Sequence, residues 1–204
     1  MAGKTVNPTR MELTRLKGRL KTARRGHKLL KDKRDELMKQ FLEIVRRNRQ
    51  LRAKVEQGLK EANDTFTVAA AVMGPEMLEQ SLLRPQRSVS LDVDARNIMS
   101  VNVPVFTFHT EGGEGSLLPY GFAQTSGELD AALEKMQEVF ADMLELAQVE
   151  KSMQLLAQDI EKTRRRVNAL EYVMIPETEK NIRYITMKLD ENERGNTTRL
   201  MKVK

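Results

Sequence analysis

The chain has 204 residues, of which 40% are hydrophobic, 31% are charged and only 4% are aromatic, with no Trp and a net charge of +6. This composition is poor in the bulky residues of a compact core and typical of long helices and coiled coils. The absence of cysteine excludes a disulfide framework and a cysteine-based metal site. Because there is neither a signal-peptide core nor an apolar run near the roughly 18–20 residues that cross a bilayer, we expect a soluble cytoplasmic protein.

Charge is distributed unevenly along the chain. Residues 1–60 carry 19 Lys or Arg against 6 Asp or Glu, and residues 162–204 carry 11 against 6. Between them, residues 61–128 carry 3 against 9, and residues 129–161 carry 2 against 8. Both ends of the chain are therefore basic and the middle is acidic. If the chain folds back on itself, the two basic ends come together, which favours an acidic partner there.

The first predicted element is a long coiled-coil helix within residues 1–64. Either Asn7 caps it, with Pro8 at the first helical position, or Thr9 and Glu12 form a capping box. Seam residues then follow at alternating spacings of three and four over seven heptads, a period that specifies a left-handed coiled coil. Such a helix rises roughly 85 Å at about 1.5 Å per residue.

The middle segment, residues 65–125, has a different character. Its breakers are Met73-Gly74-Pro75, Arg84-Pro85, Glu111 to Gly115 and Leu118-Pro119. Between them, β-branched and aromatic residues predict an antiparallel hairpin at about residues 88–108, with its connection near Arg96 to Ser100. Pro104 suits an edge position or the start of a strand. The hairpin is expected to pack on a helix, since an isolated two-stranded hairpin is marginally stable, or to offer a contact surface.

A second coiled-coil helix is predicted over residues 126–204, opened by a capping box of Thr125 and Glu128. Its seam slips by about three residues near Glu150 to Leu156, and Pro176 is predicted to kink it. The fold class is therefore mainly α, a long antiparallel two-helix left-handed coiled coil with a short β-hairpin-containing middle segment. The predicted core is Leu13, Leu16, Leu20, Leu30, Leu37, Phe41, Ile44, Leu51, Val55, Met136, Met143, Ile160, Val167, Leu170 and Met174.

Pairing Ala62 with Leu129 places Pro8 opposite about residue 183. The seam also contains the polar residues His27, Arg34 and Asn48. Buried polar residues lower stability but can fix the register of a coiled coil. Alternatively, Arg34 and His27 reach solvent at half-open layers, or the polar layers soften the packing and permit twist.

Two motifs resemble those of a known family, the D subunits of the V-type and archaeal-type rotary ATPases. The first runs from Asn7 to Leu13 and continues in Arg25 to Leu37. The second, Thr163 to Pro176, reads TRRRVNALEYVMIP and is followed by Leu189 to Arg194 and Arg199-Leu200. The resemblance covers both terminal helices, well over half of the chain.

The resemblance implies a non-catalytic central rotor shaft that holds no nucleotide, cofactor or metal. It would turn inside a hexamer of catalytic and non-catalytic subunits (A and B), with the small F subunit of the stalk alongside. A socket subunit would couple it to a membrane ring that carries H⁺ or Na⁺, so the chain would be peripheral to the membrane without entering it.

A basic belt is predicted to touch acidic loops of that hexamer. Its residues are Arg24, Arg25, Lys28, Arg164, Arg165 and Arg166, which the antiparallel pairing is expected to bring together. The belt is otherwise an ordinary solvated face. Likewise, the kink at Pro176 either tilts the distal helix off axis or is merely tolerated.

Three other classes of function remain as alternatives. A basic helical protein can bind nucleic acid, although the six Phe and three Tyr offer few stacking residues. A prefoldin-like chaperone fits the architecture but is usually shorter and acidic. An enzyme is disfavoured because His27 and His109 are the only histidines and the glycines after Glu111 lack the Lys-Ser/Thr of a phosphate loop.

Overall fold

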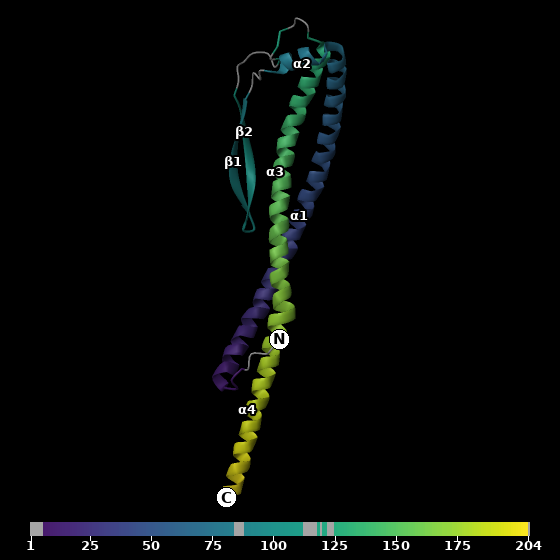
Figure 1. Ribbon diagram of the computed structural model, residues 1–204. Coiled ribbons are helices and arrows are strands. Elements are labelled where there is room, and N and C mark those ends of the chain that lie inside the picture. Colours follow the sequence, from purple (N-terminus) through teal and green to yellow (C-terminus); the bar gives the residue numbers. More distant parts are fainter. Residues whose placement is uncertain (1–5, 84–87, 112–117, 119, 122–124, 204) are drawn as a thin grey trace. The chain divides into compact units, whose positions relative to one another are not determined.

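The computed structural model describes residues 6–83, 88–111, 118, 120–121 and 125–203. In chain order, a short helix and a hairpin lie between two long helical segments (Figure 1). The elements are α1 (Arg10–Met73), α2 (Pro75–Leu82), β1 (Ser88–Ile98), β2 (Val101–Glu111), α3 (Gly127–Ala169), the π-helical turn η1 (Leu170–Met174) and α4 (Ile175–Val203). The predicted mainly helical class with a central antiparallel hairpin is confirmed.

Helix α1 begins directly after Thr9, as expected from the predicted capping box of Thr9 and Glu12. Oγ1 of Thr9 accepts the backbone N–H of Glu12 at 3.2 Å, as in a capping box. The helix continues nine residues past the expected end at residue 64, to Met73. No breaker occurs before Gly74, whose φ of 80° leaves the helical region and which precedes Pro75.

Thr125, which was predicted to open the second capping box, makes a hydrogen bond of another kind than the one Thr9 makes. Oγ1 of Thr125 donates to the carbonyl of Gly121 at 3.1 Å, and the first turn of α3 is closed by the N–H of Leu129 on the carbonyl of Ser126 at 3.0 Å. The predicted breakers at Arg84-Pro85 and Gly112 to Gly115 lie outside the described residues.

The hairpin is longer and more tightly turned than predicted. Ile98 pairs with Val101, so Met99 and Ser100 alone form the turn. Their φ values of 50° and 75° are those of a type I′ turn, whose twist matches the twist of the strands. Asn97 supports the turn, because its Oδ1 accepts the N–H of Ser100 at 3.0 Å.

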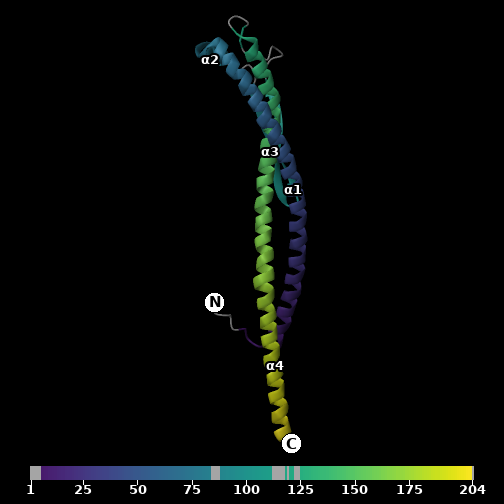
Figure 2. The same cartoon turned by 90° about the vertical axis from the view of Figure 1, so that its right-hand side faces the viewer.

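By internal contacts the chain divides into two compact units. We call residues 1–38 together with 159–204 the end unit, and residues 39–158 the middle unit. We call α3, η1 and α4 together the returning segment. In each unit a part of α1 runs antiparallel to a part of this segment, as Figures 1 and 2 both show. The end unit carries 23 basic and 12 acidic residues, net +11, whereas the middle unit carries 12 and 17, net −5.

The core of the end unit follows the predicted seam in part. Its most buried apolar side chains are Leu16, Leu37, Ile160, Val167 and Ile185. Leu13, Leu20, Leu30, Leu170 and Met174 are half-buried. Two long helices thus share a narrow seam in this unit, as in a coiled coil, rather than a thick core.

The core of the middle unit requires one correction. Val55, Ala62, Leu129, Val139 and Leu156 are buried, and Phe41, Ile44 and Leu51 are half-buried. Met136 and Met143, which were predicted core residues, are instead 38% and 37% exposed. The buried line of α3 passes through Val139, Val149 and Ser152, so these two methionines flank it.

The predicted register is wrong at two levels, although near Lys33 it is off by only one residue, since Lys33 contacts Asp159. In the middle unit Val139 lies against Gly58, so Ala62 cannot lie opposite Leu129. In the end unit Arg10 forms an ion pair with Glu193, about ten residues beyond the partner predicted for this level. The physical reason is the length of α1: because it continues to Met73, the first turns of α3 lie beside residues that were expected to be loop.

Candidate functional site

The six residues of the predicted basic belt are all exposed in the end unit. Arg24, Arg25 and Lys28 project from α1, and Arg164, Arg165 and Arg166 project from the last turns of α3. Exposure of long cationic side chains beside an apolar seam is expected, because the aliphatic stems cover the seam while the charges stay in water.

Ion pairs between the two helices show which of these residues lie at the same level. Nη2 of Arg24 is 2.6 Å from Oε1 of Glu179, and Nε2 of His27 is 3.4 Å from Oε2 of Glu171. Further along, Nζ of Lys33 is 3.7 Å from Oδ2 of Asp159. The arginine triplet 164–166 therefore lies opposite the stretch of α1 between His27 and Lys33.

This register brings only part of the predicted belt together. Lys28 falls at the level of the triplet 164–166. Arg24 and Arg25 lie opposite the stretch between Glu171 and Glu179, at least five residues beyond Arg166. The cationic face is therefore longer than a single ring and extends along several turns of the end unit.

Two belt residues are already paired within the chain. Arg24 binds Glu179, and Arg165 binds Glu161 one turn earlier on α3. No ion pair in the described part of the chain involves Arg25, Lys28, Arg164 or Arg166. These four charges are available to an acidic partner without breaking an internal contact.

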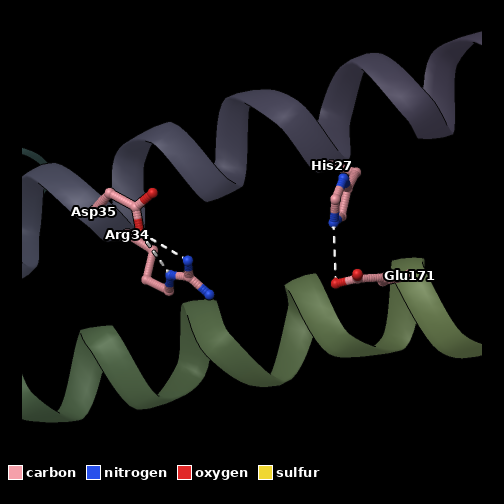
Figure 3. Close-up of polar contacts among 4 residues, drawn as sticks. All are labelled: His27, Arg34, Asp35 and Glu171. Carbon is pink, nitrogen blue, oxygen red and sulfur yellow. Dashed lines mark hydrogen bonds and ion pairs between the residues drawn. The ribbon is translucent and has the colours of Figure 1, made fainter.

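The polar seam residues have three different environments. His27 reaches across to Glu171, whereas Arg34 turns to Asp35 on its own helix, with Nε and Nη2 at 3.0 and 2.7 Å from one oxygen (Figure 3). Their side chains are 22% and 28% exposed, so solvent reaches both. Asn48 in the middle unit is buried, and its Nδ2 has no hydrogen-bond partner among the described residues.

A π-helical turn precedes Pro176 and was not predicted. The N–H of Ile175 bonds to the carbonyl of Leu170, five residues back instead of four. Because proline has no N–H and its ring crowds the carbonyl of Tyr172, a wider turn accommodates it. Tyr172 and Val173 in this turn are 71% and 58% exposed. The sequence signal was the proline four residues after Tyr172, which predicts disruption but not its form.

A second apolar stripe on α3 was also missed. Met136, Phe140 and Met143 are 38%, 41% and 37% exposed, at spacings of four and three that place them on one face of the helix. Two of these residues had been assigned to the intramolecular seam. The available signal was Phe140, which fits the period of this stripe but not that of the main seam.

Side-chain contacts and burial raise two pKa values in the middle unit. Nζ of Lys54 lies 2.8 Å from Oδ2 of Asp142, and the hydrogen bond between these side chains raises the pKa of Lys54. The hydroxyl of Tyr120 donates to Oδ1 of Asp130 at 2.6 Å. Burial first, and then this hydrogen bond, raise the pKa of Tyr120.

Two other kinds of functional element are missing from the described ranges. These ranges contain no group of three or more His, Asp or Glu side chains placed to hold a metal ion. None of their helices has the length and apolarity needed to cross a membrane.

Comparison with known proteins identifies the family. The family model for the D subunit of ATP synthase matches residues 12–204. The V-type ATP synthase D subunit of Acetivibrio thermocellus is 66% identical over 205 residues, which cover 100% of this chain and 92% of that protein. The corresponding protein of Clostridioides difficile is 62% identical over 204 residues (100% and 92%), and that of Clostridium botulinum is 60% identical over 201 residues (98% and 93%). The resemblance carried by the two end motifs is thereby confirmed, and the chain belongs to the family of ATP synthase D subunits.

Proposed function

We propose that this chain is the central rotor shaft of a V-type ATP synthase and transmits torque between the catalytic hexamer and the ion-translocating ring. The observation that carries the proposal is α1, a 64-residue helix that pairs antiparallel with the returning segment in both units. Two paired helices resist bending and twisting better than one. In this role the chain positions other subunits and is itself non-catalytic.

The cationic face of the end unit is the proposed contact with the catalytic and non-catalytic subunits A and B. Arg25, Lys28, Arg164 and Arg166 carry charge that no internal ion pair uses within the described residues. Exposed charge pairs contribute about 0–1 kcal/mol each, so such contacts can be broken and remade at each step. Large apolar anchors on this surface would instead hold the shaft in one position.

The remaining partners are assigned to the middle unit. The apolar stripe of Met136, Phe140 and Met143 is the proposed seat of the small F subunit of the stalk, because helices bind each other through stripes of this spacing. The socket subunit would bind the same unit and connect the chain to the membrane ring. The chain would then work in the cytoplasm, peripheral to the membrane.

A rotation assay tests the main proposal. The catalytic hexamer is fixed to a surface and a bead is attached to a cysteine introduced at Thr65, a position on α1 in the middle unit. Addition of ATP should turn the bead in discrete steps. A bead that stays still while the complex hydrolyses ATP would place the chain in the stator and overturn the proposal.

The cationic face has its own test. The triple variant Arg164→Glu, Arg165→Glu, Arg166→Glu should lower the torque per step, because the contacts of Arg164 and Arg166 become repulsive and the internal pair of Arg165 with Glu161 is lost. The matched control is Arg46→Glu with Arg49→Glu, two arginines of the middle unit. Equal torque for the wild type and the triple variant would count against this contact.

Pro176 is proposed to tilt α4 and so make the shaft asymmetric, supported by the π-helical turn directly before it. Pro176→Ala restores an N–H for the carbonyl of Tyr172 and should straighten this region. Rotation should then show uneven or skipped steps. Normal stepping would leave the proline as a tolerated kink.

A further inference from the structure

The orientation of one backbone N–H reveals which edge of the hairpin is open. The N–H of Phe106 donates to Oε1 of Gln148 on α3 at 2.9 Å, so it points away from β1. In an antiparallel pair, residues that do not exchange hydrogen bonds turn both of their backbone groups outward. Val93, the partner of Phe106, therefore presents its N–H and C=O at the outer edge of β1. Leu91 and Ala95, two residues to either side, do the same.

The outer edge of β2 is blocked to a further strand at two positions, Pro104 and Phe106. Pro104 occupies an outward-facing position there, opposite Ala95, and has no N–H to offer. The next outward N–H, that of Phe106, is taken by Gln148. Proline and a covering side chain are two of the ways by which proteins protect a sheet edge.

The outer edge of β1 lacks such protection. The sheet consists of two strands in the described part of the chain, and β1 contains no proline. Every residue from Val89 to Asn97 is exposed. An unprotected edge of this length is the usual receptor for an added strand.

Side chains along β1 indicate what kind of strand would bind. Val89, Leu91 and Val93 are 43%, 44% and 61% exposed and lie on one face. Asp92 and Asp94 lie on the other face. His109 is 3.2 Å from Asp92, and no ion pair of the described residues involves Asp94. A complementary strand would alternate apolar residues with Lys or Arg. A second copy of β1 would place aspartates beside aspartates, which is unfavourable.

We propose that β1 is a docking edge for an extended segment of another subunit of the ATP synthase, which adds as a third strand and alternates apolar with basic residues. Its backbone would pair with Leu91, Val93 and Ala95, its apolar side chains would cover Val89, Leu91 and Val93, and its cations would meet Asp92 and Asp94. This inference goes beyond the shaft function and does not require rotation.

Hydrogen exchange of individual amides tests the proposal in the assembled complex without nucleotide. The outward amides of Leu91, Val93 and Ala95 should exchange at least about tenfold more slowly in the complex than in the isolated chain, since each gains a hydrogen bond. The inward amides of Asp92 and Asp94 should be protected in both. Equal exchange of the outward amides in both states would overturn the proposal. The absence of ATP separates this outcome from any failure of the shaft function.

A peptide probe tests the chemistry of the added strand on the isolated chain. A nine-residue peptide that alternates Val and Lys should protect the outward amides, and a peptide that alternates Val and Glu should not. Val93→Pro removes one outward donor and should weaken binding of the lysine peptide at least about tenfold. Val93→Thr, which keeps the N–H, is the matched control. Full binding to Val93→Pro would exclude backbone pairing.

Two further outcomes keep the test decisive. If the amides of Asp92 and Asp94 lose protection in Val93→Pro, the hairpin has opened in that variant. The double variant Asp92→Lys, Asp94→Lys is then used in its place. That variant should prefer the glutamate peptide, and an unchanged preference would overturn the charge assignment. Protection that rises with the concentration of the isolated chain alone would assign the edge to a second copy and exclude the proposed occupant.

Discussion

Asn48 illustrates how burial decides the cost of a polar residue in a seam. His27 and Arg34 share the same heptad pattern, yet both have charged partners and contact with solvent. Asn48 is only 9% exposed, and its Nδ2 has no partner among the described residues. A buried donor without a partner costs about 1–3 kcal/mol.

We therefore expect Asn48→Leu to raise the free energy of unfolding of the isolated chain by about 1–3 kcal/mol. Urea unfolding followed by circular dichroism measures this change. Asn63→Leu, at an exposed position of the same helix, is the control and should change stability by less than about 0.5 kcal/mol. Loss of stability in Asn48→Leu would mean that the amide has a partner in solution.

Tyr120 gives the protein a pH dependence in the alkaline range. Burial and the hydrogen bond to Asp130 raise its pKa above the ordinary value of 10.0, so the folded chain holds this proton more tightly than the unfolded chain. The associated stability is complete below about pH 10 and is lost as the pH rises further. Tyr120→Phe should remove this alkaline loss, and should cost about 0.5–1.5 kcal/mol at pH 7 because the hydrogen bond is gone.

Urea unfolding at about pH 7 and over roughly pH 9 to 11, the range around the ordinary tyrosine pKa, checks the Tyr120 prediction. Tyr184→Phe, an exposed tyrosine on α4, is the comparison. An equal fall in stability with pH in the wild type and in Tyr120→Phe would rule out Tyr120 as the source.

At the scale of the element, Gly58 explains how closely α1 and α3 approach in the middle unit. A Cβ atom at this position would lie 2.4 Å from Cγ2 of Val139, which is buried and stiff because its side chain branches at Cβ. Only glycine permits this contact without movement. The close approach also sets the register that the sequence pattern alone predicted incorrectly.

Gly58→Ala is expected to destabilise the chain by up to about 2 kcal/mol, because overpacking costs about 1–3 kcal/mol and the gain in helix propensity returns about 1 kcal/mol. Gly26→Ala is the matched control on the same helix. No atom lies within 4 Å of its added Cβ, so this variant should be more stable than the wild type. Thermal unfolding compares them, and adding Val139→Ala to Gly58→Ala should relieve the overpacking. A Gly58→Ala chain as stable as Gly26→Ala would contradict this account of the register.

The elements themselves were largely predictable from local rules. The heptad spacing predicted both long helical segments, and alternation with β-branched residues predicted the hairpin. The end of α1 was placed too early because it was set where the heptad seam ended, near Ala62, whereas the helix ends only at Met73, before Gly74 and Pro75. The π-helical turn escaped prediction because a proline specifies a missing donor, not how the chain compensates for it.

At the scale of the whole molecule, the two units carry net charges of opposite sign. The end unit has a net charge of +11 and the middle unit one of −5. Antiparallel pairing joins both basic ends of the chain in one unit. An acidic partner would therefore meet one concentrated field instead of two separate ones.

Binding of the chain to the catalytic hexamer should consequently depend on salt. If the four belt residues without an internal ion pair contribute about 0.5 kcal/mol each, their loss together costs about 2 kcal/mol, or about thirtyfold in affinity. Raising the ionic strength from about 0.1 M to about 1 M shortens the screening length from about 10 Å to about 3 Å and should remove most of that contribution. Titration of the chain onto the hexamer at both salt concentrations measures it, and the triple Arg-to-Glu variant should show a weaker dependence. Affinity that does not change with salt would contradict an electrostatic contact.

What the sequence by itself determined is periodic and local: two long helical seams, a hairpin between them, basic ends and the motifs of the family. These follow from residue spacing and residue type alone. The tertiary structure decided which residues of the two seams face each other, and therefore which cations share a level, why Met136 and Met143 leave the core and which edge of the hairpin stays open. The physical reason is that a heptad pattern is compatible with any shift by whole heptads, so only specific contacts such as Gly58 against Val139 select one register.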